Sequence, residues 1–365
     1  MRQFLIKILS KPILWLVNKT SSKPIPSRIF QCLSKMRKDL NRKSPKTGIR
    51  LLSNIDDCKI IVFSDQHRGA KNGADDFMQC EANYLAALEF YNLHEFCFIS
   101  LGDSEELWEN RWPAVKRNNT ISFEKEKIFV ERDTFIKIYG NHDLTWNINP
   151  FTQLEIEKIY GKKIKVYEAV LLDIVKDKQH LSILLTHGHQ GDAKSDGNFF
   201  SKFFVANVWA PFQAFFKINP NTPAYNSTRK TLHNRIMYEW SATQKNLLLI
   251  TGHTHQPVFE SLTELERLYK KLLVAEEEKD QQQIDEISNR LKKVEPNFTS
   301  VSKDYLVMKP TYFNSGCCCF SDGDITGIEI ADGCIRLIKW QTGKQASERY
   351  VLEERSLHEL LEILQ

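Results

Sequence analysis

The sequence lacks paired-cysteine motifs. Its 365 residues contain eight cysteines, but no two of them have the C-x-x-C spacing that marks many redox and zinc sites. Cys317, Cys318 and Cys319 are consecutive, which is a poor geometry for a disulfide framework in a chain of this length. We therefore interpret the cysteines as reduced thiols of a cytosolic protein, and as small buried hydrophobes rather than catalytic groups.

Long hydrophobic runs, repeats and low-complexity segments are also absent. The segment from Phe4 to Val17 is mostly apolar, but Lys7, Lys11 and Pro12 interrupt it, so it is too short and too charged to predict a membrane span. It has no small-residue cleavage site, which disfavours a secretory signal. Apolar residues make up 42% and charged residues 26% of the chain, which predicts a globular protein with a substantial core.

Acidic residues are scarce in the first fifty positions. Residues 1–50 carry 13 Lys and Arg against one acid, Asp39, whereas the remaining 315 residues carry 37 basic and 45 acidic side chains. We interpret 1–50 as a basic amphipathic N-terminal arm, on which Gln3, Lys7 and Lys11 form a polar helical stripe. Such a helix can lie on an anionic membrane surface or pack on its own domain. The first alternative predicts a cytoplasmic protein at the inner face of the membrane.

The rest of the chain has the alternating pattern of a compact α/β domain. We expect this domain to span 51–345 and to be followed by a C-terminal helix over 346–365. Helical spacing is found in Asp76–Leu93. Strands are predicted at Lys59–Phe63, Phe96–Leu101, Phe135–Tyr139, Val170–Val175, Leu181–Thr186 and Leu247–Thr251, with a terminal group between Tyr312 and Trp340.

Two helical insertions interrupt the predicted domain. The first, 197–245, contains an aromatic-rich segment from Phe199 to Phe216, which fits either a lipid-binding lid or a helix buried on the domain. Arg229 and Arg235 follow it as candidate phosphate-binding residues, with solvated surface charge as the alternative. The second, 259–297, has two apolar stripes on either side of Lys279–Asp280, which predicts a charged helical hairpin.

Five short polar motifs follow predicted strands. They contain six of the ten histidines and read D-Q-H from Asp65, G-D-S-E-E from Gly102, G-N-H-D from Gly140, H-G-H from His187 and G-H-T-H from Gly252. Loops at strand ends converge in α/β active sites. Two divalent cations about 3.5–4 Å apart need a shared anion between them, and the Asp103 carboxylate can supply it. Imidazole and carboxylate ligands suit Mn, Fe and Zn.

These motifs resemble those of the calcineurin-like metallophosphoesterase superfamily, whose pattern runs D-x-H, G-D-x-x-D/E, G-N-H-D/E, a single His and G-H-x-H. The similarity covers roughly residues 58 to 340. It implies an α/β fold in which two mixed β-sheets pack face to face and are flanked by helices, as a four-layer αββα sandwich with helical insertions. It also implies two divalent metal ions, with Mn favoured and Fe or Zn as alternatives.

The resemblance also assigns roles to residues. It implies one metal held by Asp65, His67, Asp103 and His255, and a second held by Asp103, Asn141, His187 and His253. A hydroxide bridging the metals would attack phosphorus, and His142 would assist the leaving group. Glu106 would orient His142, although an acid at a helix start is an equal alternative. His187 is preferred to His189 as the ligand, which leaves His189 as a substrate-binding candidate.

Within the superfamily, the chain looks most like the branch that cleaves the pyrophosphate of UDP-2,3-diacylglucosamine. The similarity rests on G-D-S-E-E-L-W from Gly102 and G-H-T-H-Q-P from Gly252. Well-known members of that branch have Arg at the position of His142. We therefore expect a hydrolase of phosphate esters or pyrophosphates, on a phosphorylated small molecule or a lipid. The alternatives are a phosphodiesterase, nuclease or protein phosphatase of the superfamily, or a non-catalytic scaffold. The net acidic body disfavours a nucleic-acid partner.

Overall fold

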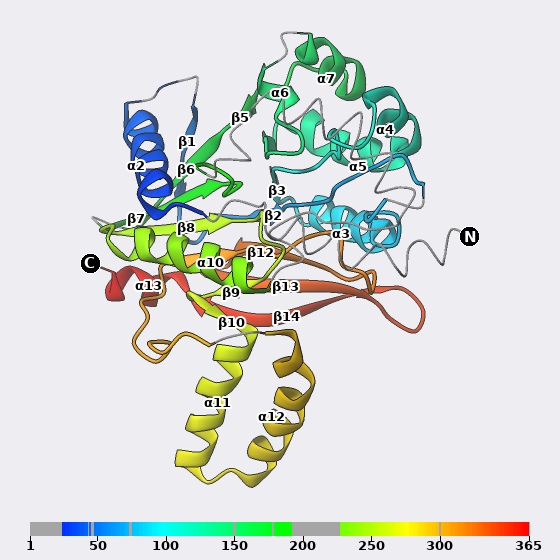
Figure 1. Ribbon diagram of the computed structural model, residues 1–365. Helices are drawn as coiled ribbons and strands as arrows, with labels where there is room; N and C mark the ends of the chain where they lie inside the picture. Colours follow the sequence, from blue (N-terminus) through cyan, green and yellow to red (C-terminus); the bar gives the residue numbers. More distant parts are fainter. Residues whose placement is uncertain are drawn as a thin grey trace.

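Two seven-stranded mixed sheets form the centre of the protein (Figure 1). The computed structural model describes residues 24–42, 44, 47–72, 75–148, 151–176, 179–191, 227–298 and 301–364. Sheet A has the order β1 (Gly48–Asn54), β6 (Ala169–Lys176), β7 (Gln179–Thr186), β8 (Leu247–Thr251), β11 (Tyr312–Asn314), β9 (Val258–Phe259), β10 (Leu262–Thr263). Sheet B has the order β14 (Ser347–Ser356), β13 (Cys334–Thr342), β12 (Ile325–Ala331), β2 (Ile60–Phe63), β3 (Cys97–Leu101), β4 (Phe135–Ile138), β5 (Val166–Tyr167).

Helices cover the outer face of each sheet. Sheet A is covered by α2 (Pro26–Asn41) and α10 (Ser227–Ala242), which share an apolar cluster with its strands. Sheet B is covered by α3 (Glu81–Leu93) and α5 (Thr120–Glu131), on the side away from α2 (Figure 1). The shorter helices are α4 (Trp112–Asn118), α6 (Thr145–Ile148), α7 (Thr152–Tyr160) and α13 (Leu357–Ile363).

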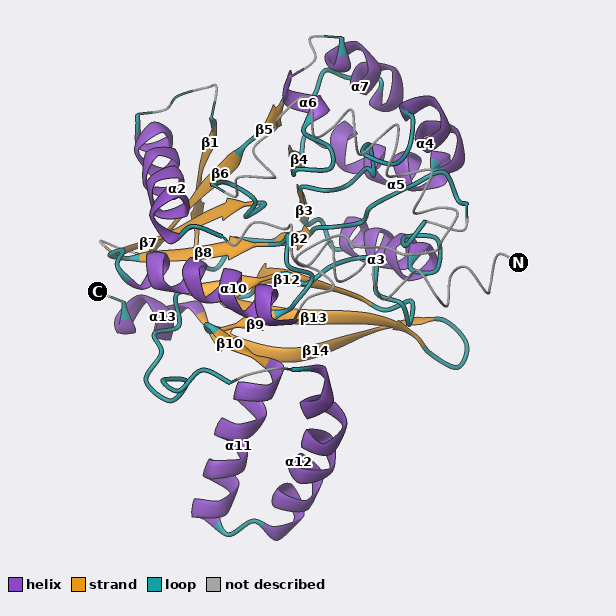
Figure 2. Ribbon diagram, viewed as in Figure 1, coloured by secondary structure: helices purple, strands orange, loops and turns teal. Residues whose placement is uncertain are grey.

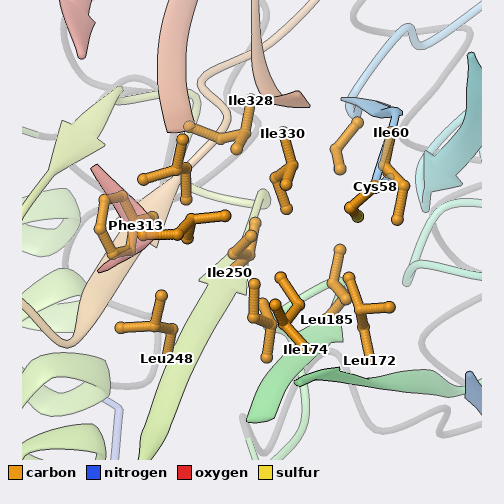
Figure 3. Packing of buried hydrophobic residues seen from close by; sticks show 14 of the residues in the cluster. Cys58, Ile60, Leu172, Ile174, Leu185, Leu248, Ile250, Phe313, Ile328 and Ile330 are labelled. Atoms are coloured by element: carbon orange, nitrogen blue, oxygen red, sulfur yellow. The ribbon is translucent and has the colours of Figure 1, made fainter. Parts of the chain in front are cut away.

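The main apolar core lies between the two sheets. Side chains alternate along each strand, so Ile60 and Val62 of β2 face this core whereas Ile61 and Phe63 face α3. Leu172 of sheet A packs in the same cluster, and Figure 3 shows residues of both sheets meeting there. Helix, sheet, sheet and helix therefore form four layers, and the predicted fold class is confirmed.

Both ends of the predicted domain differ from the expectation. Ser347–Ser356 is a strand rather than helix, because it pairs antiparallel with β13 and this pairing outweighs local helix propensity. The predicted C-terminal helix is thus confined to Leu357–Ile363. At the other end, α2 buries one apolar face on sheet A and β1 pairs with β6. The folded domain therefore includes Pro26–Asn41, which we had placed in the arm; residues 1–23 lie outside the described part of the chain.

A helical hairpin projects from the body (Figure 2). It consists of α11 (Glu264–Glu278) and α12 (Gln281–Val294), joined at Lys279 and Asp280. Leu265 of α11 packs on Leu291 of α12. The aromatic segment Phe199–Phe216 lies outside the described residues. Among the described helices, none combines the length and the apolar character that crossing a bilayer requires.

Candidate metal centre

Five loops bring the predicted ligands together. The loops follow the carboxyl ends of β2, β3 and β4 in sheet B and of β7 and β8 in sheet A. Within each sheet these strands are parallel, so their loops open at the same edge. The site therefore lies where this edge of one sheet meets that of the other.

The loop backbones have an uncommon conformation at the ligand positions. Asp65, His67, Asp103, His253 and His255 all have φ between +49° and +66°, a region that few non-glycine residues adopt. Such clustering of strained residues is typical of functional sites. The ligand atoms of these residues lie close together in the two groups described below.

Two glycines allow the loops to approach closely. A Cβ at Gly140 would lie 2.1 Å from Asp103 Oδ1, and one at Gly252 would lie 2.4 Å from Asp65 Oδ2. Both separations are far shorter than van der Waals contact. Any larger residue at either position would push a predicted ligand out of place.

One group of donors surrounds a first cation position. Asp65, His67 and His255 place ligand atoms within 4.8 Å of one another. His255 Nε2 lies 3.2 Å from Asp65 Oδ1 and 3.1 Å from His67 Nε2. Ligand atoms about 2.1 Å from one cation lie roughly 3.0–3.4 Å apart at bond angles between 90° and 110°. These separations fit a common cation.

A second group lies beside the first, and its Asp103 also lies close to His67 of the first group. Asp103, His187 and His253 again place ligand atoms within 4.8 Å of one another. Asp103 Oδ2 lies 3.1 Å from His187 Nε2 and 3.7 Å from His67 Nε2. One carboxylate oxygen therefore stands between the two groups, as a bridging ligand would.

Several donors are buried without a partner. Within the described part of the chain, four buried atoms make no well-aligned hydrogen bond: Asp65 Oδ1, Asn141 Oδ1, His187 Nε2 and His253 Nε2. Two of them have only an ion-pair neighbour within the site, because Asp65 Oδ1 lies near His255 and His187 Nε2 lies near Asp103. A buried polar atom without a partner costs about 1–3 kcal/mol. Four such atoms at one place are explained if they bind cations, so the donor set fits two divalent metal ions.

The other atoms of these side chains are held by hydrogen bonds. His187 Nδ1 donates to the Leu101 carbonyl at 2.9 Å. Asp65 Oδ2 accepts from the His253 amide at 2.9 Å, and Asp103 Oδ1 accepts from the His142 amide at 2.8 Å. Such contacts fix the tautomer and orientation of metal ligands. With one atom of each side chain held by these hydrogen bonds, the other ligand atom remains available to a cation.

Glu106 connects the centre to His142. Its carboxylate accepts from Nδ1 of His67 at 2.8 Å and from Nδ1 of His142 at 2.9 Å. The His142 ring also stacks on Trp108 with 4.1 Å between centroids. Burial alone would raise the pKa of Glu106, but His142 and His67 lower it to about 2. Glu106 is therefore an anion that orients both imidazoles.

The pKa is raised for two histidines of the site and lowered for a third. Burial lowers the pKa of His187 and His255, but Asp103 beside the first and Asp65 beside both raise each pKa to about 9. Burial and the neighbouring His187 instead lower the pKa of His189 to about 3. The carboxylates thus draw positive charge to the centre, and a bound cation would replace these protons.

The predicted substrate-binding residues differ in placement. His189 is buried at the site, with its ring 5.3 Å from that of His187. Arg235 is exposed instead and pairs with Glu239 one turn along α10 at 3.0 Å, so it is not brought to the site. Helical geometry explains this, because the face of α10 that packs on the protein presents His233. The side chain of Arg229 lies outside the described residues.

Three site residues were missed in the sequence. His233 Nε2 donates to the Gly188 carbonyl at 2.9 Å, and its ring lies 5.2 Å from that of His253. Cys317 and Cys319 lie beside His255. The thiols did carry a signal, because they follow a strand as the five motifs do. His233 carried none, since its contact depends on how α10 packs.

No protein-family profile matches the sequence, and no curated protein matches it. Several solved structures resemble the fold weakly, two of which are Vps29 proteins. Vacuolar Protein Sorting 29 from Cryptosporidium parvum is 10% identical, with 82% of this chain and 98% of that chain covered and a TM-score of 0.32. A single mutant of Vps29 from Entamoeba histolytica is 14% identical, with 81% and 99% covered and a TM-score of 0.28. Likeness at this level carries no information on activity, which depends on the residues of the site.

Proposed function

We propose that the protein is a dinuclear metal-dependent hydrolase of phosphate esters or pyrophosphates. The observation that supports this most is the set of buried, unpaired ligand atoms around the shared Asp103 carboxylate. One cation would be held by Asp65, His67, Asp103 and His255, and the other by Asp103, Asn141, His187 and His253. When bound, two such cations supply an activated water and neutralise charge on the phosphoryl group.

His142 has the position of a proton donor to the leaving group. Its Nδ1–H is committed to Glu106, which leaves Nε2 for the substrate. The Glu106 carboxylate and the stack on Trp108 together hold the orientation of the His142 ring. Transfer of the Nε2 proton to the departing oxygen would avoid an alkoxide or a highly charged phosphate.

The substrate class is a further part of the proposal. We favour a lipid-linked or nucleotide-diphosphate substrate, on the similarity of the Gly102 and Gly252 motifs to the UDP-diacylglucosamine branch. His142 supplies a titratable proton donor where those enzymes have Arg, which suits a leaving group that needs protonation. Assays on p-nitrophenyl phosphate, bis-(p-nitrophenyl) phosphate and UDP-diacylglucosamine separate monoester, diester and pyrophosphate cleavage.

The deciding experiment uses full-length protein loaded with Mn²⁺. We expect hydrolysis of at least one of the three substrates, and a loss of roughly 100-fold or more in Asp103→Asn, which weakens the shared ligand. Asp173→Asn is the matched control, because its buried carboxylate pairs with Arg50 on sheet A. If the protein binds two equivalents of Mn²⁺ and turns over none of the substrates, it is a scaffold and the hydrolase proposal fails.

An anionic membrane surface remains a proposed partner of the N-terminal segment alone. Helix α2 packs its apolar face on sheet A, so it is not available to a bilayer. Residues 1–23 carry five Lys and Arg and no acid, a composition that favours anionic lipid. Co-sedimentation with anionic and with neutral liposomes tests this. Equal partitioning of the full chain and a chain lacking residues 1–22 would exclude it.

A further inference from the structure

Two thiols lie on the far side of a predicted metal ligand. His255 directs Nε2 to Asp65 Oδ1 at 3.2 Å, whereas its Nδ1 lies 3.5 Å from the Cys319 sulfur. The sulfurs of Cys317 and Cys319 and a ring nitrogen of His255 all lie within 4.8 Å of one another. The imidazole therefore stands between a carboxylate site and a thiol site.

The loop after β11 fixes these thiols in place. Cys318 points the opposite way, into the apolar cluster that contains Cys80, so the residues on either side of it share the face toward His255. The Cys318 amide lies 3.2 Å from both the Ser64 and the Asp65 carbonyls. The loop is thus hydrogen-bonded to the segment that carries a ligand of the dinuclear centre.

We propose that Cys317, Cys319 and His255 form a separate binding site for a soft divalent cation of the Zn²⁺ class. Zn–S bonds of about 2.3 Å and Zn–N bonds of about 2.0–2.1 Å at a tetrahedral angle place the two ligand atoms roughly 3.5 Å apart. The Nδ1 to Cys319 sulfur distance is 3.5 Å. Three protein ligands leave a fourth position for water.

Ligand chemistry distinguishes this site from the dinuclear centre. Thiolates select Zn²⁺ over Mn²⁺ or Mg²⁺, whereas carboxylate, amide oxygen and imidazole accept the harder ions. Cys317 is buried whereas Cys319 is partly exposed, so a cation would have an entry path beside Cys319. The two sites therefore prefer different classes of cation.

The shared imidazole couples the two sites. A neutral imidazole offers one lone pair, so His255 cannot serve a cation at Nε2 and another at Nδ1 unless it loses its remaining proton. Binding of the soft cation therefore weakens the neighbouring site that uses Nε2. This coupling rests on the proposed dinuclear centre, whereas the thiolate site itself does not.

Cobalt absorption tests the site without relying on activity. Metal-free full-length protein, kept reduced by a phosphine, is titrated with Co²⁺ and then with Zn²⁺. We expect a near-ultraviolet thiolate-to-cobalt charge-transfer band that equimolar Mn²⁺ leaves in place and Zn²⁺ removes. Co²⁺ bound only by the carboxylate and imidazole ligands of the dinuclear centre would give no such band, and that result would overturn the proposal.

Substitutions locate the ligands. The double variant Cys317→Ser, Cys319→Ser is expected to lose the band, whereas Cys318→Ala and Cys334→Ser are expected to keep it. Should the double variant not fold, Cys319→Ser alone replaces the less buried thiol, and the band is expected to fall to roughly half because one of two thiolates is removed. A band of unchanged intensity in either variant would contradict the assignment. Hydrolysis of p-nitrophenyl substrates is not needed for any of these results.

Discussion

Glu106 holds His142 and His67 with one carboxylate, whose Oε2 lies 2.7 Å from Nδ1 of His142 and 2.8 Å from Nδ1 of His67. His142 is the proposed proton donor and His67 is a proposed metal ligand. The Glu106 carboxylate therefore sets the tautomer of both rings: His142, which would protonate the leaving oxygen, and His67, which would bind a cation. A change at Glu106 should affect both functions together.

Glu106→Gln is expected to lower kcat and metal affinity, each by about 10- to 100-fold, because an amide cannot accept from both imidazoles as a carboxylate does. KM should change less. Steady-state kinetics and Mn²⁺ titration by calorimetry measure the two effects. Glu109→Gln is the matched control, since the Glu109 carboxyl lies near Glu106 and His67, whereas the Nδ1 atoms of both imidazoles donate to Glu106. A fall in kcat with unchanged Mn²⁺ affinity would contradict the shared role.

Removal of metal is expected to destabilise the protein. A ligand that binds only the folded state adds about 2.7 kcal/mol when its concentration is 100 times Kd. We therefore expect Mn²⁺ to raise Tm above its value in EDTA, and Asp103→Asn to reduce that rise. Thermal unfolding followed by circular dichroism measures the difference. An identical Tm with EDTA and with saturating Mn²⁺ would argue against a folded-state metal site.

Gly140→Ala is expected to weaken Mn²⁺ binding by more than about 10-fold, because the new Cβ would lie 2.1 Å from Asp103 Oδ1. Gly161→Ala is the control for backbone effects. Its Cβ would meet only Lys127 at 3.8 Å, but its φ is +71°, so it should cost roughly 1–2 kcal/mol of stability without a change in affinity. Calorimetry and urea unfolding of both variants separate the two effects. Similar Mn²⁺ affinity in both would refute the steric argument.

Alkaline pH is expected to destabilise the fold through Cys58. Burial raises the pKa of this thiol from 9.0 to about 11. Below about pH 9 the thiol is neutral in folded and unfolded chains, whereas between about pH 9 and 11 only the unfolded chain releases its proton. Stability therefore falls as pH rises through this window, by roughly 2 kcal/mol at about pH 10.5.

Urea unfolding of the wild type and of Cys58→Ala from about pH 8 to 10.5 tests this linkage. The variant should lose less stability over the range. Cys334→Ala serves as the control, because that thiol is only partly buried at the first residue of β13. Parallel pH curves for the wild type and Cys58→Ala would rule the linkage out.

The sequence predicted the strands whose signal is local. Ile60–Phe63 and Leu247–Thr251 are continuous apolar runs, and the polar motifs after them mark where they end. β1 was missed because its pairing partner is β6, more than a hundred residues away. β14 was missed for a similar reason, since its mixed polar pattern becomes a strand only by pairing with β13. Long-range pairing of this kind leaves little trace in a local pattern.

The candidate site shows the same division. The five motifs placed Asp65, Asp103 and His253 correctly at strand ends, because each motif is short and follows its strand directly. From α10, the sequence predicted Arg235 as a site residue. The face of the helix that packs on the protein instead presents His233, and Arg235 pairs with Glu239. Helix rotation is fixed by the apolar residues that contact sheet A, and these alternate with polar residues too irregularly to reveal it.

The left-handed backbone of the five ligand residues has an energetic consequence. Each non-glycine residue at such φ costs about 1–2 kcal/mol, so Asp65, His67, Asp103, His253 and His255 together oppose folding by roughly 5 kcal/mol or more. That amount is comparable with the whole stability of a typical domain. Glycine at these positions would remove this conformational cost, and the protein would be more stable but would lack its metal ligands. The metal centre therefore lowers the free energy of unfolding in return for a backbone geometry that brings the ligands together.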